Sequence, residues 1–256
     1  MLIPLLFQYT AYAQTVPLPA AHAHNDYEHT KPLTEALSYG FTSIEADVYL
    51  IGGELIVSHD FPEPGKRRTL KELYLEPLRA RIKENQGRVF AGDSITLFLM
   101  IDIKSKGEAT YQVLRKQLAE YTSMLQFPGH PGPVSVVLSG NRPIQTVLDD
   151  QARMVSIDGR PADLDKGYPA DFMPLVSEHY GRVLHWKGEG PIPEEEKNRL
   201  RTLTSRAHEQ GRRVRLWASP EKEDVWKALL QGGADLISTD QLERLNKFLL
   251  PLSSRK

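Results

Sequence analysis

The feature that most constrains the fold is a regular alternation of short apolar runs with longer amphipathic segments. The apolar runs are rich in β-branched residues and match buried strands, whereas the segments between them match helices. Such alternation is typical of βαβ units that build a parallel sheet. About eight such units in a chain of 256 residues favour a closed (β/α)8 barrel over an open sheet. We therefore predict an α/β fold, a single-domain TIM barrel.

The expected elements follow from the same periodicity. We predict strands at Ala20–Asn25, Ser43–Leu50, Ile95–Ile103, Val134–Ser139, Met154–Ile157, Met173–Ser177, Val214–Ala218 and Leu236–Ser238. We predict helices near Pro32–Tyr39, Leu70–Glu84, Glu108–Gln126, Pro143–Asp149, Glu194–Gln210, Glu221–Gln231 and Gln241–Leu249. The segment from Gly159 to Pro174 shows no convincing helix, so the unit that contains it is the weakest.

The N-terminus resembles a leader peptide. Its sequence, MLIPLLFQYTAYAQ, has a short apolar run followed by Ala11-Tyr12-Ala13, which is similar to a signal-peptide cleavage site. The basic residues that usually precede such a run are missing, so we interpret residues 1–13 as a truncated signal peptide of an exported, periplasmic or secreted protein. The alternative is an apolar N-terminal arm. No later segment approaches the ~20 apolar residues of a transmembrane helix, and we assign residues 20–250 to the barrel domain.

Composition excludes some classes of site. The chain has no cysteine, which rules out thiolate zinc sites, a cysteine nucleophile and disulfides. Its formal net charge of -1 gives no electrostatic support for binding to nucleic acid or to an anionic membrane. We therefore expect a small-molecule or lipid substrate, and the oligomeric state stays open.

Carboxylates at two strand ends predict a metal site. Glu45 and Asp47 are two apart in the run IEADV, so they point to the same side of a strand. Buried paired carboxylates need a cation or a proton between them. Asp102 ends a second buried run, LFLMIDIKS, with Lys104 on the same side. Hard cations such as Mg²⁺ or Ca²⁺ prefer such oxygen ligands. The alternatives are that the strand with Glu45 and Asp47 faces solvent, and that Asp102 and Lys104 form a structural ion pair.

Histidines flank these carboxylates in the sequence. Gly52-Gly53 predicts a turn between two strand-like runs, a small hairpin insertion after the second strand that carries His59 back toward Glu45. His22 and His24 are two apart on the first strand. Because histidine titrates near neutral pH, these residues are candidates for general acid and base. Spacing does not rank His22 against His24.

Together, these motifs resemble the glycerophosphodiester phosphodiesterase family, within the phosphatidylinositol phospholipase C-like TIM-barrel phosphodiesterases. The family pattern is a first-strand His, then E-x-D, then His-Asp, then an acidic residue two positions before a Lys. These positions fall on His22, Glu45 with Asp47, His59 with Asp60, and Asp102 with Lys104. A late strand that ends in Trp217 and the closing segment GGADLISTD also resemble the family.

The chain departs from the family on its first strand. Members usually have His-Arg-Gly there, with the Arg helping to bind phosphate, but this chain reads His22-Ala23-His24-Asn25. We expect His24 to replace the missing Arg. Asp102 stands where many members have Glu. The His-x-x-Asn start is similar to the related sphingomyelinase D-type enzymes.

The resemblance implies a metal-dependent phosphodiester hydrolase that acts on a glycerophosphodiester or a phospholipid-type head group. One Ca²⁺ or Mg²⁺ would lie on Glu45, Asp47 and Asp102. His22 and His59 would be the catalytic acid and base, and the substrate would contact Lys104, His24 and Trp217, the last of which is nearly as well explained as a core residue. In related enzymes the attacking hydroxyl can belong to the substrate, which gives a cyclic phosphate. The head group, the metal and the form of the product stay open.

Two other functions fit parts of the sequence. A zinc-dependent TIM-barrel metallohydrolase would use the His22-x-His24 pair, with His179, His185 and Asp240 as further ligands. That hypothesis leaves Glu45, Asp47 and His59 without a role. A non-catalytic exported binding protein on the same barrel is the second alternative, since a fold does not imply a function.

Overall fold

The computed structural model describes residues 15–63, 65 and 68–253. Its strands are β1 (Leu18–Ala23), β2 (Phe41–Ile51), β3 (Glu54–Val57), β4 (Leu97–Ile103), β5 (Val134–Gly140), β6 (Val155–Gly159), β7 (Leu175–His179), β8 (Arg213–Trp217) and β9 (Leu236–Thr239). Its α-helices are α1 (Thr34–Ser38), α2 (Glu76–Glu84), α3 (Gly107–Leu118), α4 (Ile144–Asp149), α5 (Tyr180–Val183), α6 (Glu194–Glu209), α7 (Glu223–Gln231) and α8 (Leu242–Ser253). The predicted leader over residues 1–13 lies outside the described residues.

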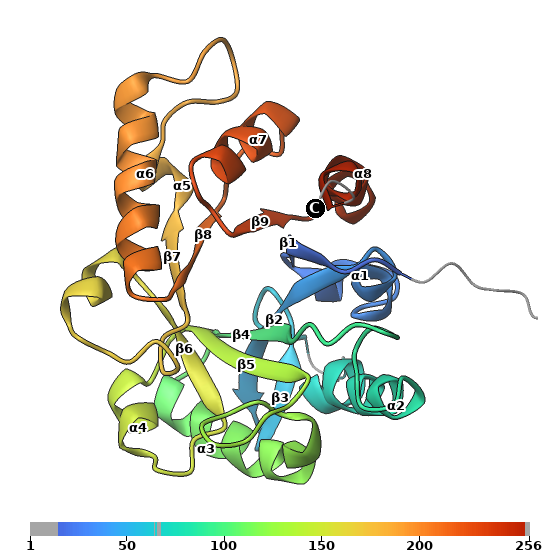
Figure 1. Ribbon diagram of the computed structural model, residues 1–256. Coiled ribbons are helices and arrows are strands. Elements are labelled where there is room, and N and C mark those ends of the chain that lie inside the picture. Colours follow the sequence, from blue (N-terminus) through green and yellow to red (C-terminus); the bar gives the residue numbers. More distant parts are fainter. Residues whose placement is uncertain (1–14, 64, 66–67, 254–256) are drawn as a thin grey trace, which may run out of the picture.

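In the described part of the chain, eight parallel strands close into a single-domain TIM barrel, which confirms the predicted fold. Neighbouring strands follow the order β1-β9-β8-β7-β6-β5-β4-β2, and the β1–β2 pairing closes the ring. Helices lie around the outside of the strands (Figure 1). The main hydrophobic core lies between these two layers.

The predicted hairpin is also present. Strand β3 pairs antiparallel with the end of β2, with Val48 opposite Val57 and Ile51 opposite Glu54. The turn between them is Gly52-Gly53, and both glycines have positive φ, which suits the residue with no Cβ. Strand β3 therefore extends β2 outside the barrel ring and returns the chain toward the carboxyl ends of the strands.

Each predicted strand corresponds to one barrel strand, and the differences lie at element ends. The first strand ends at Ala23 because Asn25 adopts a left-handed conformation, with φ 47°, before a 3₁₀ turn at Asp26–Glu28. The predicted helix after β4 ends at Leu118 and continues as a 3₁₀ turn at Ala119–Met124. The helix α2 is preceded by a π-helical turn at Lys71–Leu75. The weak unit after β6 contains a short 3₁₀ turn at Pro161–Asp165.

The barrel interior is unusually polar. A small apolar cluster of Met100, Leu175 and Leu236 occupies part of it. Buried polar side chains of the strands occupy another part: His22, Ser43, Glu45, Asp47, Ser139, Asp158, Ser177 and Arg215. Buried charges require partners, so we expect ion pairs and hydrogen bonds to connect this polar layer. No helix among the described residues is long and apolar enough to cross a membrane.

Candidate active site

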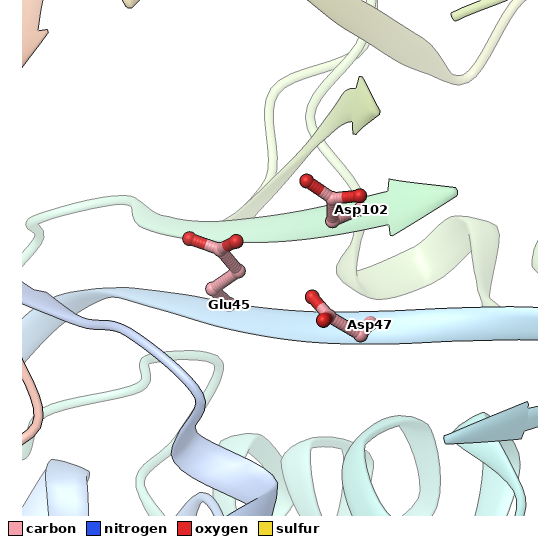
Figure 2. A group of neighbouring side chains, drawn as sticks. All are labelled: Glu45, Asp47 and Asp102. Carbon is pink, nitrogen blue, oxygen red and sulfur yellow. The ribbon is translucent and has the colours of Figure 1, made fainter. Parts of the chain in front are cut away.

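Three carboxylates gather at the carboxyl ends of β2 and β4. The strand register pairs Asp47 directly with Asp102, and Glu45 lies two residues earlier on β2. Figure 2 shows Glu45 and Asp47 projecting from β2 and Asp102 from the adjacent β4. One oxygen of each lies within 4.8 Å of the others. Because the carboxyl ends of barrel strands form the active face of TIM barrels, this cluster is the natural centre of a site.

Lys104 bridges two members of the cluster. Its Nζ lies 3.0 Å from Asp47 Oδ2 and 3.1 Å from Asp102 Oδ1. Burial and the charge of Glu45 nevertheless raise the pKa of Asp47 to about 6. Burial and Glu45 likewise raise the pKa of Asp102. One ammonium group therefore does not fully neutralise the two aspartates.

Glu45 has different partners. Its Oε2 accepts a 2.6 Å hydrogen bond from Arg215 Nη1, and His22 Nε2 lies 2.8 Å away. Burial disfavours the charged carboxylate, but Arg215 and His22 outweigh it and hold the pKa of Glu45 well below its usual range. Burial and the Arg215 charge lower the pKa of His22 to about 4, so this histidine is neutral at neutral pH.

A fourth carboxylate, Asp158 on β6, completes the polar layer. It accepts hydrogen bonds from Ser139 at 2.9 Å and from Ser177 at 2.6 Å. Arg160 donates to the same carboxylate at 2.8 Å, and Arg215 Nη2 lies 3.8 Å from it. Arg215 therefore links Glu45 on one side of the barrel interior to Asp158 on the other.

A divalent cation fits this cluster. Asp47 Oδ1 is buried and forms no hydrogen bond of good geometry within the described part of the chain. The three ligands are all carboxylates, which suit a hard cation such as Mg²⁺ or Ca²⁺. A cation here would remove the repulsion that raises the pKa values of Asp47 and Asp102. Among the described residues, no other group of three or more histidines or carboxylates has this arrangement.

A cavity of about 500 Å³ opens directly on the cluster. His24, which follows β1, lies in its wall, as does His59, which follows β3. Trp217 at the end of β8 is another wall residue, and its ring packs edge-on to His179 at 4.5 Å between centroids. Apart from Ile103 and Gly140, the remaining lining is polar: Glu45, Tyr49, Asp102, Lys104, Ser139, Asn141, Arg160 and Arg215.

The two histidines predicted on the first strand, His22 and His24, differ in how far their side chains are buried. His22 is fully buried, with Nδ1 2.7 Å from Ser43 Oγ and Nε2 against Glu45 and Arg215. His24 is partly exposed and reaches the cavity, with Nδ1 2.8 Å from Asp240 Oδ1. His24 is thus the one of the two that a ligand in this cavity can reach.

The hairpin positions His59. The backbone N–H of Ser58 donates to the Asp47 carbonyl at 3.2 Å, which fixes the chain beside the carboxylate cluster. The Tyr49 hydroxyl donates to the His59 carbonyl at 3.4 Å. The His59 ring itself is largely exposed, and its Nδ1 lies 3.5 Å from Asp60 Oδ1. His59 therefore lines the cavity with its ring accessible to solvent.

Comparison with known proteins agrees with this geometry. A family model described as an AIM6-like phosphodiesterase domain matches residues 10–158. The chain belongs to this family. It is 31% identical over 260 residues to the Altered inheritance of mitochondria protein 6 homolog of Arthroderma benhamiae, covering 89% of this chain and 82% of that protein. It is 27% identical over 302 residues to Altered inheritance of mitochondria protein 6 of Kluyveromyces lactis, covering 90% of this chain and 72% of that protein.

A solved structure shares the fold of this AIM6-like domain. A glycerophosphodiester phosphodiesterase from Parabacteroides distasonis superposes with a TM-score of 0.51 at 12% sequence identity, covering 94% of this chain and 98% of that one. This likeness confirms the TIM-barrel fold, and the family match agrees with the predicted resemblance to the glycerophosphodiester phosphodiesterase-like barrels.

Sequence reasoning missed two arginines of this AIM6-like site. Arg215 and Arg160 both line the cavity, on β8 and directly after β6. A signal for them existed: in VSIDGR and VRLW, polar residues occupy alternate positions of otherwise apolar strands, as Glu45 and Asp47 do. The cavity therefore has arginines although the first-strand Arg of the glycerophosphodiester phosphodiesterases is absent. The described residues do not gather a three-histidine group of the kind that a zinc hydrolase would need.

Proposed function

We propose that this protein is a metal-dependent phosphodiester hydrolase whose substrate is a glycerophosphodiester or a phospholipid-type head group. The observation that carries the proposal is the carboxylate cluster of Glu45, Asp47 and Asp102, of which Glu45 and Asp102 line one cavity with two histidines. A divalent cation would be held by these carboxylates and would supply Lewis-acid stabilisation of the charge that builds on the phosphate. The family match supports phosphodiester chemistry, and the substrate itself is part of the proposal.

The residues of the chain perform the other tasks. Lys104 Nζ, held between two carboxylates, is placed to contact a non-bridging phosphate oxygen. Arg160 and Arg215 add positive charge to the cavity wall. The polar layer below Glu45 fixes that carboxylate through Arg215 and His22, so the site is preorganised before substrate binds.

We assign the proton transfers to His24 and His59. One ring would accept the proton of the attacking hydroxyl, and the other would donate a proton to the leaving alkoxide. His24 takes this role in place of the predicted His22, because His22 is fully buried and already contacts Ser43, Glu45 and Arg215. The earlier expectation that His24 replaces a phosphate-binding arginine is then unnecessary, since Arg160 and Arg215 already line the cavity.

The surroundings of His59 leave room for both arms of a diester. A second cavity of about 550 Å³ adjoins this histidine, with Asn25, Ser58, Phe61 and Arg68 in its wall. His59 lines both cavities. A phosphate at the carboxylate cluster would therefore have one substituent over the barrel mouth and the other past His59.

The proposal is tested by hydrolysis of bis(p-nitrophenyl) phosphate in the presence of Ca²⁺, Mg²⁺, Zn²⁺ or EDTA. We expect activity with Ca²⁺ or Mg²⁺ that EDTA abolishes. Asp102→Asn is expected to reduce turnover roughly 100-fold or more, because it removes one charge from the cluster. The matched control is Asp171→Asn, which removes an exposed carboxylate paired with Arg153 and should leave turnover unchanged.

The possible outcomes separate the hypotheses. Activity with Zn²⁺ only would move the assignment to a zinc hydrolase. No activity with any metal, for this diester and for glycerophosphodiesters, would contradict the proposal and favour a binding role. Full activity of Asp102→Asn would remove the carboxylate cluster from the mechanism.

We also propose that the protein is exported. The proposal rests on the apolar run and the Ala11-Tyr12-Ala13 motif of the sequence. It is tested by expression of the chain with and without residues 1–13, followed by cell fractionation. Retention of both forms in the cytoplasm would contradict it.

A further inference from the structure

The His24 ring has a carboxylate partner that is not among the residues lining the cavity. His24 Nδ1 lies 2.8 Å from Asp240 Oδ1, directly after β9. An ionised carboxylate only accepts hydrogen bonds, so Nδ1 must carry the hydrogen and Nε2 is left free. We propose that Asp240 is a positioning residue that holds His24 with Nδ1 protonated and Nε2 directed to the cavity. The catalytic meaning of this inference rests on the proposed function.

The backbone places the two side chains beside each other. Strands β1 and β9 are neighbours, with Ala23 paired to Thr239, and the His24 N–H donates to the Thr239 carbonyl at 3.1 Å. Each of the paired side chains follows its strand by one residue. The His24–Asp240 contact therefore follows from the strand register of the closed barrel and does not depend on a flexible loop.

Glu221 fixes the segment that carries Asp240. Its Oε1 accepts hydrogen bonds from the Asp240 N–H and from the Thr239 hydroxyl, both at 2.7 Å. The Thr239 hydroxyl oxygen in turn accepts from the Gln241 N–H at 2.9 Å. These bonds hold the backbone of Asp240, while its carboxylate is left to His24.

Stability does not account for this arrangement. The Asp240 side chain is 58% exposed and that of His24 is 35% exposed. Exposed ion pairs contribute little to folding. The pair does, however, fix the tautomer and the orientation of a ring that lines the cavity, which is how a carboxylate assists a histidine that transfers protons.

The two cavity histidines, His24 and His59, differ in how firmly a carboxylate partner is fixed beside the ring. The His59 ring is 58% exposed, and its neighbour Asp60, at 3.5 Å, is 97% exposed. No strand pairing fixes that contact. Of the two cavity histidines, His24 is therefore the preorganised one, because Asp240 holds its ring in place.

The charges around His24 come from several strands. Glu45 on β2, Arg215 on β8, His22 on β1 and Asp240 after β9 all act on it electrostatically. Lys104, Arg160 and His59 share its cavity. Burial lowers the pKa of His24, but the hydrogen bond to Asp240 and the charges of Glu45 and Asp240 outweigh it, so the net direction is upward. Loss of the Asp240 charge should therefore lower this pKa.

The first test is nitrogen NMR of the full chain labelled at histidine nitrogens, with the His24 signals assigned from a His24→Gln variant. We expect neutral His24 to be the Nδ1–H tautomer in the wild type. Asp240→Ala should shift the ring toward the Nε2–H tautomer and lower its pKa. Asp240→Asn retains an acceptor oxygen without the charge, so it should lower the pKa but preserve the tautomer.

A matched control exists on another part of the surface. His208 Nε2 lies 2.8 Å from Asp235 Oδ2, a pair of the same length that does not line the cavity. Asp235→Asn should leave the His24 signals unchanged. An Nε2–H tautomer in the wild type, or an unchanged tautomer in folded Asp240→Ala, would overturn the inference.

The second test is kinetic. With bis(p-nitrophenyl) phosphate as substrate, Asp240→Ala should lower kcat about 10-fold or more with little change in KM. The limb of the pH profile that reports His24 should move to lower pH in Asp240→Asn. Unchanged kcat and pH profile would reject the positioning role. Absence of wild-type hydrolysis would count against the proposed function only, because the NMR result decides the tautomer independently.

Discussion

At the scale of single residues, His59 is the simplest test of proton transfer. Its ring is exposed and lines the cavity, and it makes few contacts that folding requires. We therefore expect His59→Ala to lower turnover by ~10²-fold or more while leaving stability nearly unchanged, which is the usual magnitude for loss of an acid or base. His208→Ala, at an exposed histidine outside the cavity, is the control. Unchanged turnover in folded His59→Ala would remove this residue from the mechanism.

The raised pKa of the buried Asp26 gives a prediction of how the stability of the fold depends on pH. It is fully buried, and its Oδ2 accepts hydrogen bonds from the Leu33 N–H and the Tyr74 hydroxyl. Burial nevertheless raises the pKa of Asp26 from 3.8 to about 6. Because the folded state then binds a proton that the unfolded state has released, stability is lost as pH rises from about 4 through about 6.

Comparison with Asp26→Asn isolates this effect. From pH 5 to pH 7, the wild type should lose about 1 kcal/mol of unfolding free energy through Asp26, and the variant should lack that loss. Urea unfolding of both proteins at the two pH values measures it. Equal pH dependence of the two proteins would show that Asp26 titrates normally. Other buried carboxylates contribute equally to both proteins and cancel in the difference.

At the scale of elements, the end of β5 limits the space around the carboxylate cluster. Gly140 has φ +67° and pairs with Ile103 beside Asp102. A Cβ at this position would overlap the Asp102 carboxylate and the Ile103 carbonyl. Gly140→Ala is therefore strained in its backbone and displaces a predicted metal ligand.

We expect Gly140→Ala to weaken metal binding at least 10-fold and to cost about 1–2 kcal/mol in unfolding free energy. Isothermal titration with Mg²⁺ or Ca²⁺ and urea unfolding would measure the two effects. Gly167→Ala is a matched control, since Gly167 has φ +68° but a Cβ there meets no atom within 4 Å. If both variants bind metal like the wild type, Asp102 is not positioned by the end of β5.

Element patterns also explain which parts of the site were predictable. Glu45, Asp47 and Asp102 followed from alternation in apolar strands, and Gly52-Gly53 gave the hairpin that carries His59. Arg215 and Asp158 also occupy alternate positions of apolar strands. Their role in the site, however, depends on the contact between them inside the barrel, and no local sequence pattern encodes that contact. The choice between His22 and His24 depends on where β1 ends, and that end is set by the left-handed backbone at Asn25.

At the scale of the whole molecule, the barrel gathers charges from strands that are distant in the sequence. In and above the polar layer, four carboxylates pair with three cationic side chains. The carboxylates are Glu45, Asp47, Asp102 and Asp158, and the cations are Lys104, Arg160 and Arg215. Four carboxylates and three cationic side chains leave a net charge of −1. A divalent cation would change this net charge to +1, and a singly charged phosphodiester would then neutralise the site. The charge balance therefore matches one metal ion and one diester.

This balance predicts that a divalent cation stabilises the fold. At a concentration 100 times its dissociation constant, Mg²⁺ or Ca²⁺ should add about 2.7 kcal/mol of unfolding free energy, which corresponds to a rise in Tm of about 5 °C or more. Thermal unfolding with EDTA and with each metal measures the shift. Asp102→Asn should abolish it, whereas Asp171→Asn should retain it, because Asp171 pairs with Arg153 away from the cluster. Since the carboxylates lie on β2 and β4, a missing shift in the wild type would mean that these two strands do not share a cation.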